Sequence, residues 1–84
     1  MSDLPPGWTR TGDVIEKTYD LGGFPAAIAF VGRVAEEAEA ADHHPDIDIR
    51  YAKVRLALTT HSAGGLTDKD FALARAIEER CGPG

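Results

Sequence analysis

The chain has 84 residues, of which 43% are hydrophobic and 27% charged, and its formal net charge is −5. This composition is typical of one folded globular domain over residues 1–84 and excludes a disordered polyelectrolyte. Because this acidic chain has no cluster of Lys and Arg, we expect neither nucleic-acid binding nor attraction to an anionic membrane surface. A domain this small gains stability by association, so we expect a homo-oligomer.

The cysteine content and the N-terminal residues indicate the cellular compartment of the protein. The single cysteine, Cys81, cannot form a disulfide within the chain. The first residues lack the charged-then-apolar pattern of a signal peptide, and no apolar run has the length of a membrane span. We therefore expect a cytoplasmic protein.

The first residues in chain order predict two strands. Residues 8–11 have a strand-like composition, and Gly12 and Asp13 mark a turn. Alternation over residues 14–21 then indicates a half-exposed strand, which could form a hairpin with the first.

The period changes at Phe24, where apolar residues begin to recur at spacings of three and four. This pattern predicts an amphipathic helix up to Ala41. Pro45 disfavours helical geometry at His44, so the helix should stop around Asp42. The expected inward stripe consists of Phe24, Ala27, Ile28, Val31, Val34, Ala35 and Ala38.

Two strands and a second helix are predicted after Pro45. The apolar residues switch parity around residues 52–53, which indicates a turn or bulge joining two strands, the second ending at residues 59–61. Residues 62–65 read as a flexible turn. Thr67 is then the expected helix N-cap, with Asp70 as its capping-box partner, and residues 82–84 should stop the helix.

This order of elements predicts an α+β two-layer sandwich. Strand pairs joined by short turns favour a four-stranded antiparallel sheet, with the helices packed on one face. The free edges of such a sheet need protection, which edge-to-edge or helix-to-helix dimerisation would supply in part.

The candidate chemistry lies in the three histidines, which fall at the ends of predicted elements. His43 and His44 follow the first predicted helix, and His61 ends the last predicted strand. Two carboxylates complete the set: Glu39 lies one helical turn before His43, and Asp70 lies in the first turn of the second predicted helix. A histidine with an ordinary pKa of about 6.5 can both donate and accept protons near neutrality. The set therefore favours proton-transfer chemistry such as the elimination of water.

Each of these residues also has a purely structural interpretation. A histidine at a helix end can interact with the helix dipole, Glu39 can be solvated, Asp70 can act only as a cap, and Tyr51 can belong to the sheet surface. Three histidines could instead bind zinc with an open fourth position, although adjacent side chains in extended backbone tend to diverge. A nucleophilic mechanism lacks a partner set, since Cys81 lies near the chain end.

The spacing of these residues resembles the signature of the pterin-4a-carbinolamine dehydratase family. The matching positions are Glu39, His43, His44, Pro45, Tyr51, His61 and Asp70, and the flanking residues 34–39, 58–61 and 65–67 agree. The resemblance runs from about Trp8 to Ile77. This sequence departs from the family pattern at its start, since only seven residues precede Trp8, where family members commonly carry a helix.

The resemblance implies a four-stranded antiparallel sheet with helices on one face, and dimers or tetramers. It implies dehydration of 4a-hydroxytetrahydrobiopterin to quinonoid dihydropterin in tetrahydrobiopterin recycling, without a metal or cofactor. The implied catalytic residues are His43, His61 and His44, the first two for proton transfer and His44 mainly for binding the pterin. Glu39 and Asp70 would support them, and Tyr51 and Thr60 would help to bind the substrate.

Two alternatives stay open at this point. The same fold could act as a protein-binding module, either as a dimerisation cofactor for a transcription factor or as an assembly chaperone. The protein could also act on another pterin, such as a molybdopterin-related compound.

Overall fold

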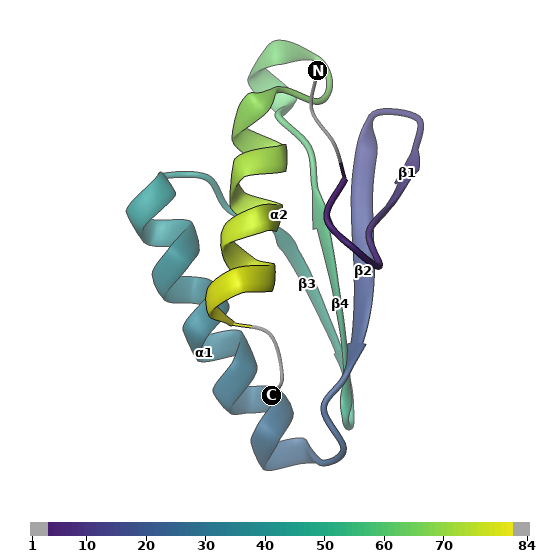
Figure 1. Ribbon diagram of the computed structural model, residues 1–84, viewed down its shortest axis with the longest axis vertical. Helices are drawn as coiled ribbons and strands as arrows, with labels where there is room; N and C mark the ends of the chain where they lie inside the picture. Colours follow the sequence, from purple (N-terminus) through teal and green to yellow (C-terminus); the bar gives the residue numbers. More distant parts are fainter. Residues whose placement is uncertain (1–3, 82–84) are drawn as a thin grey trace.

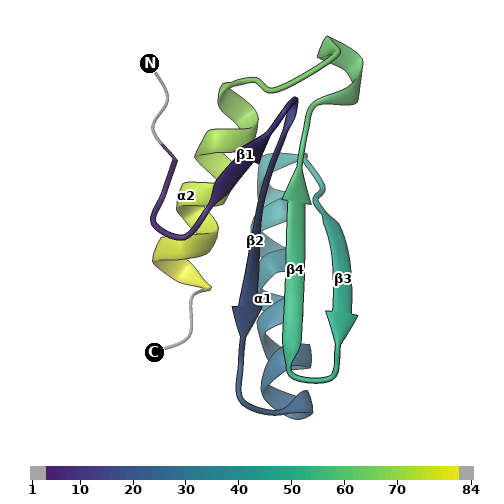
Figure 2. The ribbon, with the colours of Figure 1, turned by 90° about the vertical axis from the view of Figure 1, so that its right-hand side faces the viewer.

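The computed structural model describes residues 4–81. It contains β1 (Thr9–Thr11), β2 (Val14–Asp20), α1 (Phe24–Ala41), β3 (Asp46–Arg50), β4 (Lys53–Leu58), the short 3-10 helix η1 (His61–Ala63) and α2 (Asp68–Arg80). The strands form an antiparallel sheet in the order β1-β2-β4-β3. Both long helices cover the same face of this sheet, as Figures 1 and 2 show, which confirms the predicted two-layer α+β fold.

The core lies between the sheet and the helices. Alternate residues of β2 and β4 point inward, including Ile15, Tyr19 and Leu56. The predicted inward stripe of α1 was partly wrong, because the buried residues are Ala27, Phe30, Val34 and Ala38, whereas Phe24, Ile28 and Ala35 are exposed. The apolar surface of α1 is wider than the line that contacts the sheet, and only packing selects which line is buried.

The strand ends differ slightly from the prediction. β3 stops at Arg50 because Tyr51 adopts a left-handed backbone with φ of 54°. His61 does not end a strand, because β4 stops at Leu58 and His61 begins η1 where a flexible turn was expected.

The predicted start of α2 is confirmed. Thr67 is the N-cap and forms a capping box with Asp70. Leu66 and Phe71, which stand where a hydrophobic staple would pair, are partly buried against the core. The predicted stop at residues 82–84 lies outside the described residues.

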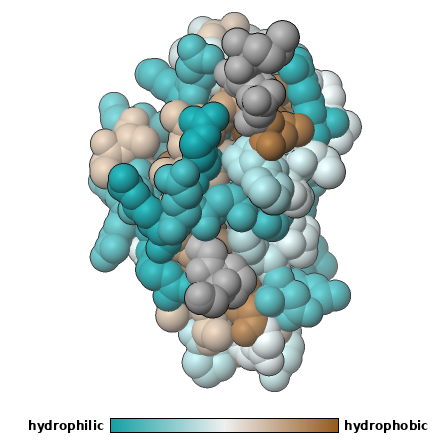
Figure 3. All heavy atoms as spheres, viewed as in Figure 1, coloured by the Kyte–Doolittle hydropathy of each residue, from teal (hydrophilic) through white to brown (hydrophobic). Residues whose placement is uncertain are grey.

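The surfaces on the two sides of the molecule are largely polar. On the open face of the sheet, Arg55 Nε donates to Glu16 Oε1 at 2.7 Å across neighbouring strands. The helical face is mainly hydrophilic, with small apolar areas between charged side chains (Figure 3). Over residues 4–81, no helix combines the length and apolar character needed to cross a membrane.

Candidate active site

The first candidate residue, His43, is positioned by the end of α1. Asp42 adopts a left-handed conformation with φ of 51°, and the His43 N–H donates to Ala38 O at 3.1 Å, which closes the helix. This turn brings the His43 ring against the first turn of α2. The distance between His43 Nε2 and Asp70 Oδ1 is 2.5 Å.

Asp70 is the centre of a buried hydrogen-bond network. Its side chain is fully buried, and its Oδ2 accepts from Thr60 Oγ1 at 2.8 Å and from the Thr67 N–H at 2.9 Å. The Thr60 and Thr67 hydroxyls are 2.9 Å apart. Because the one Thr60 proton goes to Asp70, the Thr67 hydroxyl donates to Thr60. The network therefore joins the ends of α1 and β4 to the start of α2.

The network also fixes which nitrogen of His43 remains for chemistry. Asp70 Oδ1 is an acceptor, so His43 Nε2 carries the proton between them. The remaining nitrogen, Nδ1, is then the atom that can exchange a proton with another molecule. A carboxylate that orients an imidazole in this way is the usual arrangement in general acid–base sites.

His44 is held differently. Its Nε2 lies 2.5 Å from Glu39 Oε2, but the side chains are 58% and 78% exposed. An exposed ion pair contributes about 0–1 kcal/mol, so this contact orients His44 only weakly. The exposed His44 ring is therefore accessible to a bound molecule from the solvent side.

His61 lies at the same end of the molecule. It is exposed at the start of η1, directly after Thr60 in the chain. Figure 1 shows η1 at the top of the fold beside the start of α2, with the end of α1 lower and to the left in the same half of the molecule. Within residues 4–81, the His61 side chain makes no hydrogen bond or ion pair, so both ring nitrogens are free.

Tyr51 and Thr60 occupy unexpected positions for substrate-binding residues. Tyr51 is 74% exposed in the turn between β3 and β4, and this turn lies at the opposite end of the sheet from η1 (Figure 2). Thr60 is buried, with its hydroxyl hydrogen-bonded to Asp70. The structure thus joins His43, Asp70 and Thr60 directly, pairs His44 with Glu39, and leaves Tyr51 apart.

Sequence reasoning missed a second polar cluster, which lies near the end of α2. Glu78 Oε1 accepts from Lys17 Nζ at 2.5 Å and from the Tyr19 hydroxyl at 2.5 Å. Lys17 also donates to Pro6 O at 3.1 Å. The sequence carried one signal for this cluster. Lys17 is a charged residue that alternates with Ile15 and Tyr19 in the predicted strand over residues 14–21, and those two residues face the core.

The pKa values in this second cluster are shifted by burial and by its contacts. Burial alone would raise the pKa of Glu78, but the hydrogen bonds from Lys17 and Tyr19 outweigh it and hold that pKa below its usual range. Burial and the hydrogen bond to Glu78 raise the pKa of Tyr19. Burial likewise raises the pKa of the Cys81 thiol, which favours the structural interpretation of that cysteine.

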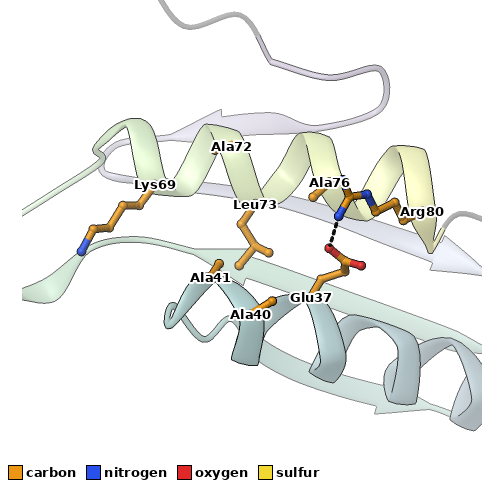
Figure 4. Close-up of a pocket in the computed structure, with 8 residues that line it drawn as sticks. All are labelled: Glu37, Ala40, Ala41, Lys69, Ala72, Leu73, Ala76 and Arg80. Atoms are coloured by element: carbon orange, nitrogen blue, oxygen red, sulfur yellow. Dashed lines mark hydrogen bonds and ion pairs between the residues drawn. The ribbon is translucent and has the colours of Figure 1, made fainter.

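A groove of about 370 Å³ lies elsewhere, between the two long helices. Figure 4 shows Leu73 pointing across it toward α1, and the ion pair of Arg80 with Glu37 at one side. None of the predicted site residues lines this groove. In the part of the chain that is described, no group of three or more His, Cys, Asp and Glu side chains is placed to hold a metal ion.

Comparison with known proteins decides the family. The sequence profile described as "Pterin 4 alpha carbinolamine dehydratase" matches residues 1–80. The chain belongs to this family. It is 66% identical over 77 residues to "Putative pterin-4-alpha-carbinolamine dehydratase" of Chloroflexus aurantiacus, covering 92% of this chain and 83% of that protein. A Nocardia farcinica protein of the same name is 61% identical over 79 residues, covering 94% and 82%.

One solved structure supports the same assignment, and a second shares the fold. A "transcriptional coactivator/pterin dehydratase" from Brucella melitensis superposes with a TM-score of 0.85 at 32% identity, over 92% of this chain and 84% of that one. A pterin dehydratase-like protein described as a RuBisCO assembly factor in the alpha-carboxysome has a TM-score of 0.71 at 19% identity, over 92% and 89%. The second likeness shows the fold alone.

Proposed function

We propose that this pterin-4a-carbinolamine dehydratase family member removes water from a 4a-hydroxytetrahydropterin, by acid–base catalysis with His43 and His61. The observation that carries the proposal is the buried Asp70 carboxylate holding His43 Nε2 at 2.5 Å. A fully buried acid that orients an imidazole at an element end is an arrangement that favours proton transfer. The family membership supplies the substrate class.

The reaction needs two proton movements. The hydroxyl on C4a leaves as water after it is protonated, while the N5 lone pair forms the C4a=N5 bond and the N5 proton is removed. One imidazole donates the proton to the hydroxyl and another base accepts the N5 proton, so the enzyme ends with no net change in protons. His43 Nδ1 and the free ring of His61 are the two groups we assign to these steps.

Binding is assigned to the remaining residues of the signature. His44, loosely held by Glu39, faces solvent, where it can hydrogen-bond the pterin and assist catalysis from outside the buried network. The resemblance also implies a substrate contact for Tyr51, but within one chain its turn lies at the opposite end of the sheet from η1, so we assign the pterin contact to His44. Thr60 lies behind Asp70, to which its hydroxyl donates. The physiological substrate we propose is 4a-hydroxytetrahydrobiopterin, formed when aromatic amino acid hydroxylases spend their cofactor.

The proposed chemistry needs no metal or cofactor. A 4a-carbinolamine already loses water unaided, and positioned acid–base groups add about 10²–10⁴-fold. We further propose a cytoplasmic location, because the single cysteine leaves no internal disulfide that an oxidising compartment would maintain. A homodimer or homotetramer is proposed on the grounds of domain size.

The deciding experiment follows quinonoid dihydropterin formation from freshly generated 4a-hydroxytetrahydropterin, with and without a chelator. We expect a rate above background that survives the chelator and is lost in His61→Ala. Arg75→Ala is a matched surface control, since Arg75 is exposed on α2 outside the site. Loss of activity with chelator would contradict the metal-free mechanism.

The alternative function is a protein-binding module, as a dimerisation cofactor or assembly chaperone. It is favoured by the similarity to a protein described both as a transcriptional coactivator and as a pterin dehydratase. Such a role would not need the His43–Asp70 pair. A wild-type protein without any rate above background, whose His43→Ala variant keeps its fold, would favour this alternative.

A further inference from the structure

The hydroxyl of Thr67 makes more contacts than the start of a helix needs. As the N-cap of α2, its oxygen accepts from the Asp70 N–H. The same hydroxyl lies 2.9 Å from the Thr60 hydroxyl and donates to it, because the Thr60 proton is used at Asp70. Capping a helix requires only an acceptor oxygen, which Ser, Thr, Asn and Asp all supply. Capping therefore does not explain the proton that Thr67 donates.

That proton sets the direction of the hydrogen bonds around Asp70. A hydroxyl has one proton, so Thr60 can donate either to Thr67 or to Asp70. Because Thr67 is itself a donor, the Thr60 proton goes to Asp70 Oδ2 at 2.8 Å. Asp70 Oδ2 also accepts from the Thr67 N–H, and Oδ1 remains for His43 Nε2. Thr67 is thus connected to the His43 ring through two intervening side chains.

The two threonines also close the loop that carries His61. Thr60 and Gly65 exchange a pair of backbone hydrogen bonds, each 3.2 Å long. The contact between the Thr60 and Thr67 hydroxyls therefore lies at the base of the loop over residues 61–66. Figure 1 shows η1, which belongs to this loop, beside the start of α2. One hydroxyl contact joins the base of the loop to the buried network at the start of α2.

We propose that Thr67 is a positioning residue for the dehydration, and that its donated proton, separately from its capping oxygen, holds His43 and the His61 loop in place for proton transfer. This inference rests on the proposed function. It adds a residue that touches neither the imidazoles nor the solvent side of the site. Thr67 acts on both proton carriers from behind them.

The consequence of losing the donor follows from the count of protons. Without a donor at position 67, the Thr60 proton is shared between that position and Asp70, so Oδ2 loses a hydrogen bond for part of the time. The carboxylate and the base of the loop are then held less firmly. We expect kcat to fall and KM to change little, because the pair of His44 and Glu39 lies outside this network.

Four substitutions at position 67 separate donation from capping. Thr67→Ser and Thr67→Asn keep an acceptor for the helix and a donor for Thr60. Thr67→Asp keeps the acceptor but has no donor, whereas Thr67→Gly has neither but is a tolerated N-cap that adds no charge. We expect the first two variants to keep kcat within about twofold and the last two to lower it about tenfold, the effect of one hydrogen bond.

Stability gives a different order of the same four variants, which makes the comparison decisive. As N-caps, Ser, Asn and Asp are about equal and Gly is slightly weaker. Thermal unfolding should therefore group Thr67→Asp with Thr67→Ser and Thr67→Asn, while kcat should group it with Thr67→Gly. A kcat that follows stability across the four variants would assign Thr67 to capping alone and overturn the proposal.

The effect of added charge is controlled by Thr18→Asp. Thr18 is exposed on the open face of the sheet, and this variant should leave kcat unchanged. A loss of kcat in Thr67→Asp without a loss in Thr67→Gly would assign the effect to charge and contradict the positioning role. An equal loss in Thr67→Ser would assign it to the methyl group and contradict it as well.

The ring of His43 supplies a measurement that does not depend on turnover. In protein labelled with 15N-histidine at mildly alkaline pH, NMR reports which ring nitrogen carries the proton, and His43→Ala assigns the signals. We expect the proton on Nε2 in wild type, Thr67→Ser and Thr67→Asn, and a proton shared between the two nitrogens in Thr67→Asp and Thr67→Gly.

The two measurements distinguish failure of the inference from failure of the proposed function. A wild type without dehydratase activity, whose His43 signals still follow the donor at position 67, would refute the function and keep the positioning of His43 by Thr67. An active wild type with the same kcat and the same His43 signals in all four variants would refute the positioning role and keep the function.

Discussion

Two carboxylates on α2 make a direct comparison, Asp70 in its first turn and Glu78 in its last turns. Both accept two or more hydrogen bonds from other elements. Glu78 binds Lys17 and Tyr19, and Lys17 itself lies 4.5 Å from the centre of the Tyr19 ring, so this cluster is closed on itself. Asp70 binds an imidazole that keeps a second nitrogen free. The proposed catalytic cluster therefore differs from the Glu78 cluster in the group that the carboxylate binds, an imidazole with a second ring nitrogen, and not in the carboxylate itself.

The largest expected effect is that of removing Asp70. Asp70→Ala leaves the Thr60 hydroxyl and the Thr67 N–H without their acceptor, which should lower the free energy of unfolding by about 2–5 kcal/mol. It also frees the His43 ring, so kcat should fall by about 10²–10⁴-fold. Denaturant unfolding and steady-state kinetics measure the two losses.

His43→Ala is the matched control for that prediction. It should reduce kcat to a similar extent while costing much less stability, because Asp70 keeps both Oδ2 contacts. Equal loss of stability in the two variants would mean that Asp70 acts mainly through His43 and not as a cap.

The next largest effect is expected in the cluster of Glu78, Lys17 and Tyr19. Glu78→Gln should lower the free energy of unfolding at neutral pH by about 1–3 kcal/mol, because the Lys17 ammonium loses the negative charge that faces it. Turnover should stay unchanged, since the cluster is at the far end of α2 from His43. A fall in kcat without loss of stability would contradict the structural role of Glu78.

The lowered pKa of Glu78 predicts how the stability of the Glu78→Gln variant, relative to wild type, depends on pH. Because its folded pKa is depressed, Glu78 stabilises the fold above its unfolded pKa of about 4.3 and loses that contribution as pH falls through the folded pKa. The stability difference between wild type and Glu78→Gln should therefore be largest near neutrality and shrink in acid. Thermal unfolding between neutral and acidic pH measures this trend.

A smaller effect is expected at Thr60, for which we propose a role through its hydrogen bond to Asp70 and no direct contact with substrate. Thr60→Val keeps the shape but removes the hydrogen bond to Oδ2, which corresponds to about 1–2 kcal/mol. We expect a several-fold lower kcat with little change in KM, and recovery in Thr60→Ser. A change confined to KM would instead support direct substrate binding by Thr60.

The smallest stability effect is expected for the exposed pair. Glu39→Gln should change the free energy of unfolding by less than about 1 kcal/mol, because both partners face solvent.

His44→Ala should raise KM more than it lowers kcat, as expected for a residue that mainly binds the pterin. The reverse split, measured by steady-state kinetics, would exchange the roles of His44 and His43.

The sequence by itself determined the local structure. The change of apolar period predicted α1, the parity switch predicted the β3–β4 hairpin, and the Thr67–Asp70 spacing predicted the capping box. These features depend on neighbours within a few residues, so local spacing encodes them. Family resemblance added the signature positions.

Only the tertiary structure decided the contacts that span the chain. It selected Phe30 in place of Phe24 as the buried ring of α1, and it joined His43 to a residue 27 positions away. It linked Lys17 to Glu78 over 61 positions and placed Tyr51 at the far end of the sheet from His61. Packing selects one of several apolar lines on a helix, and the sheet fixes which chain ends meet. The spacing of residues along the chain determines neither the buried line of the helix nor the pairing of distant segments.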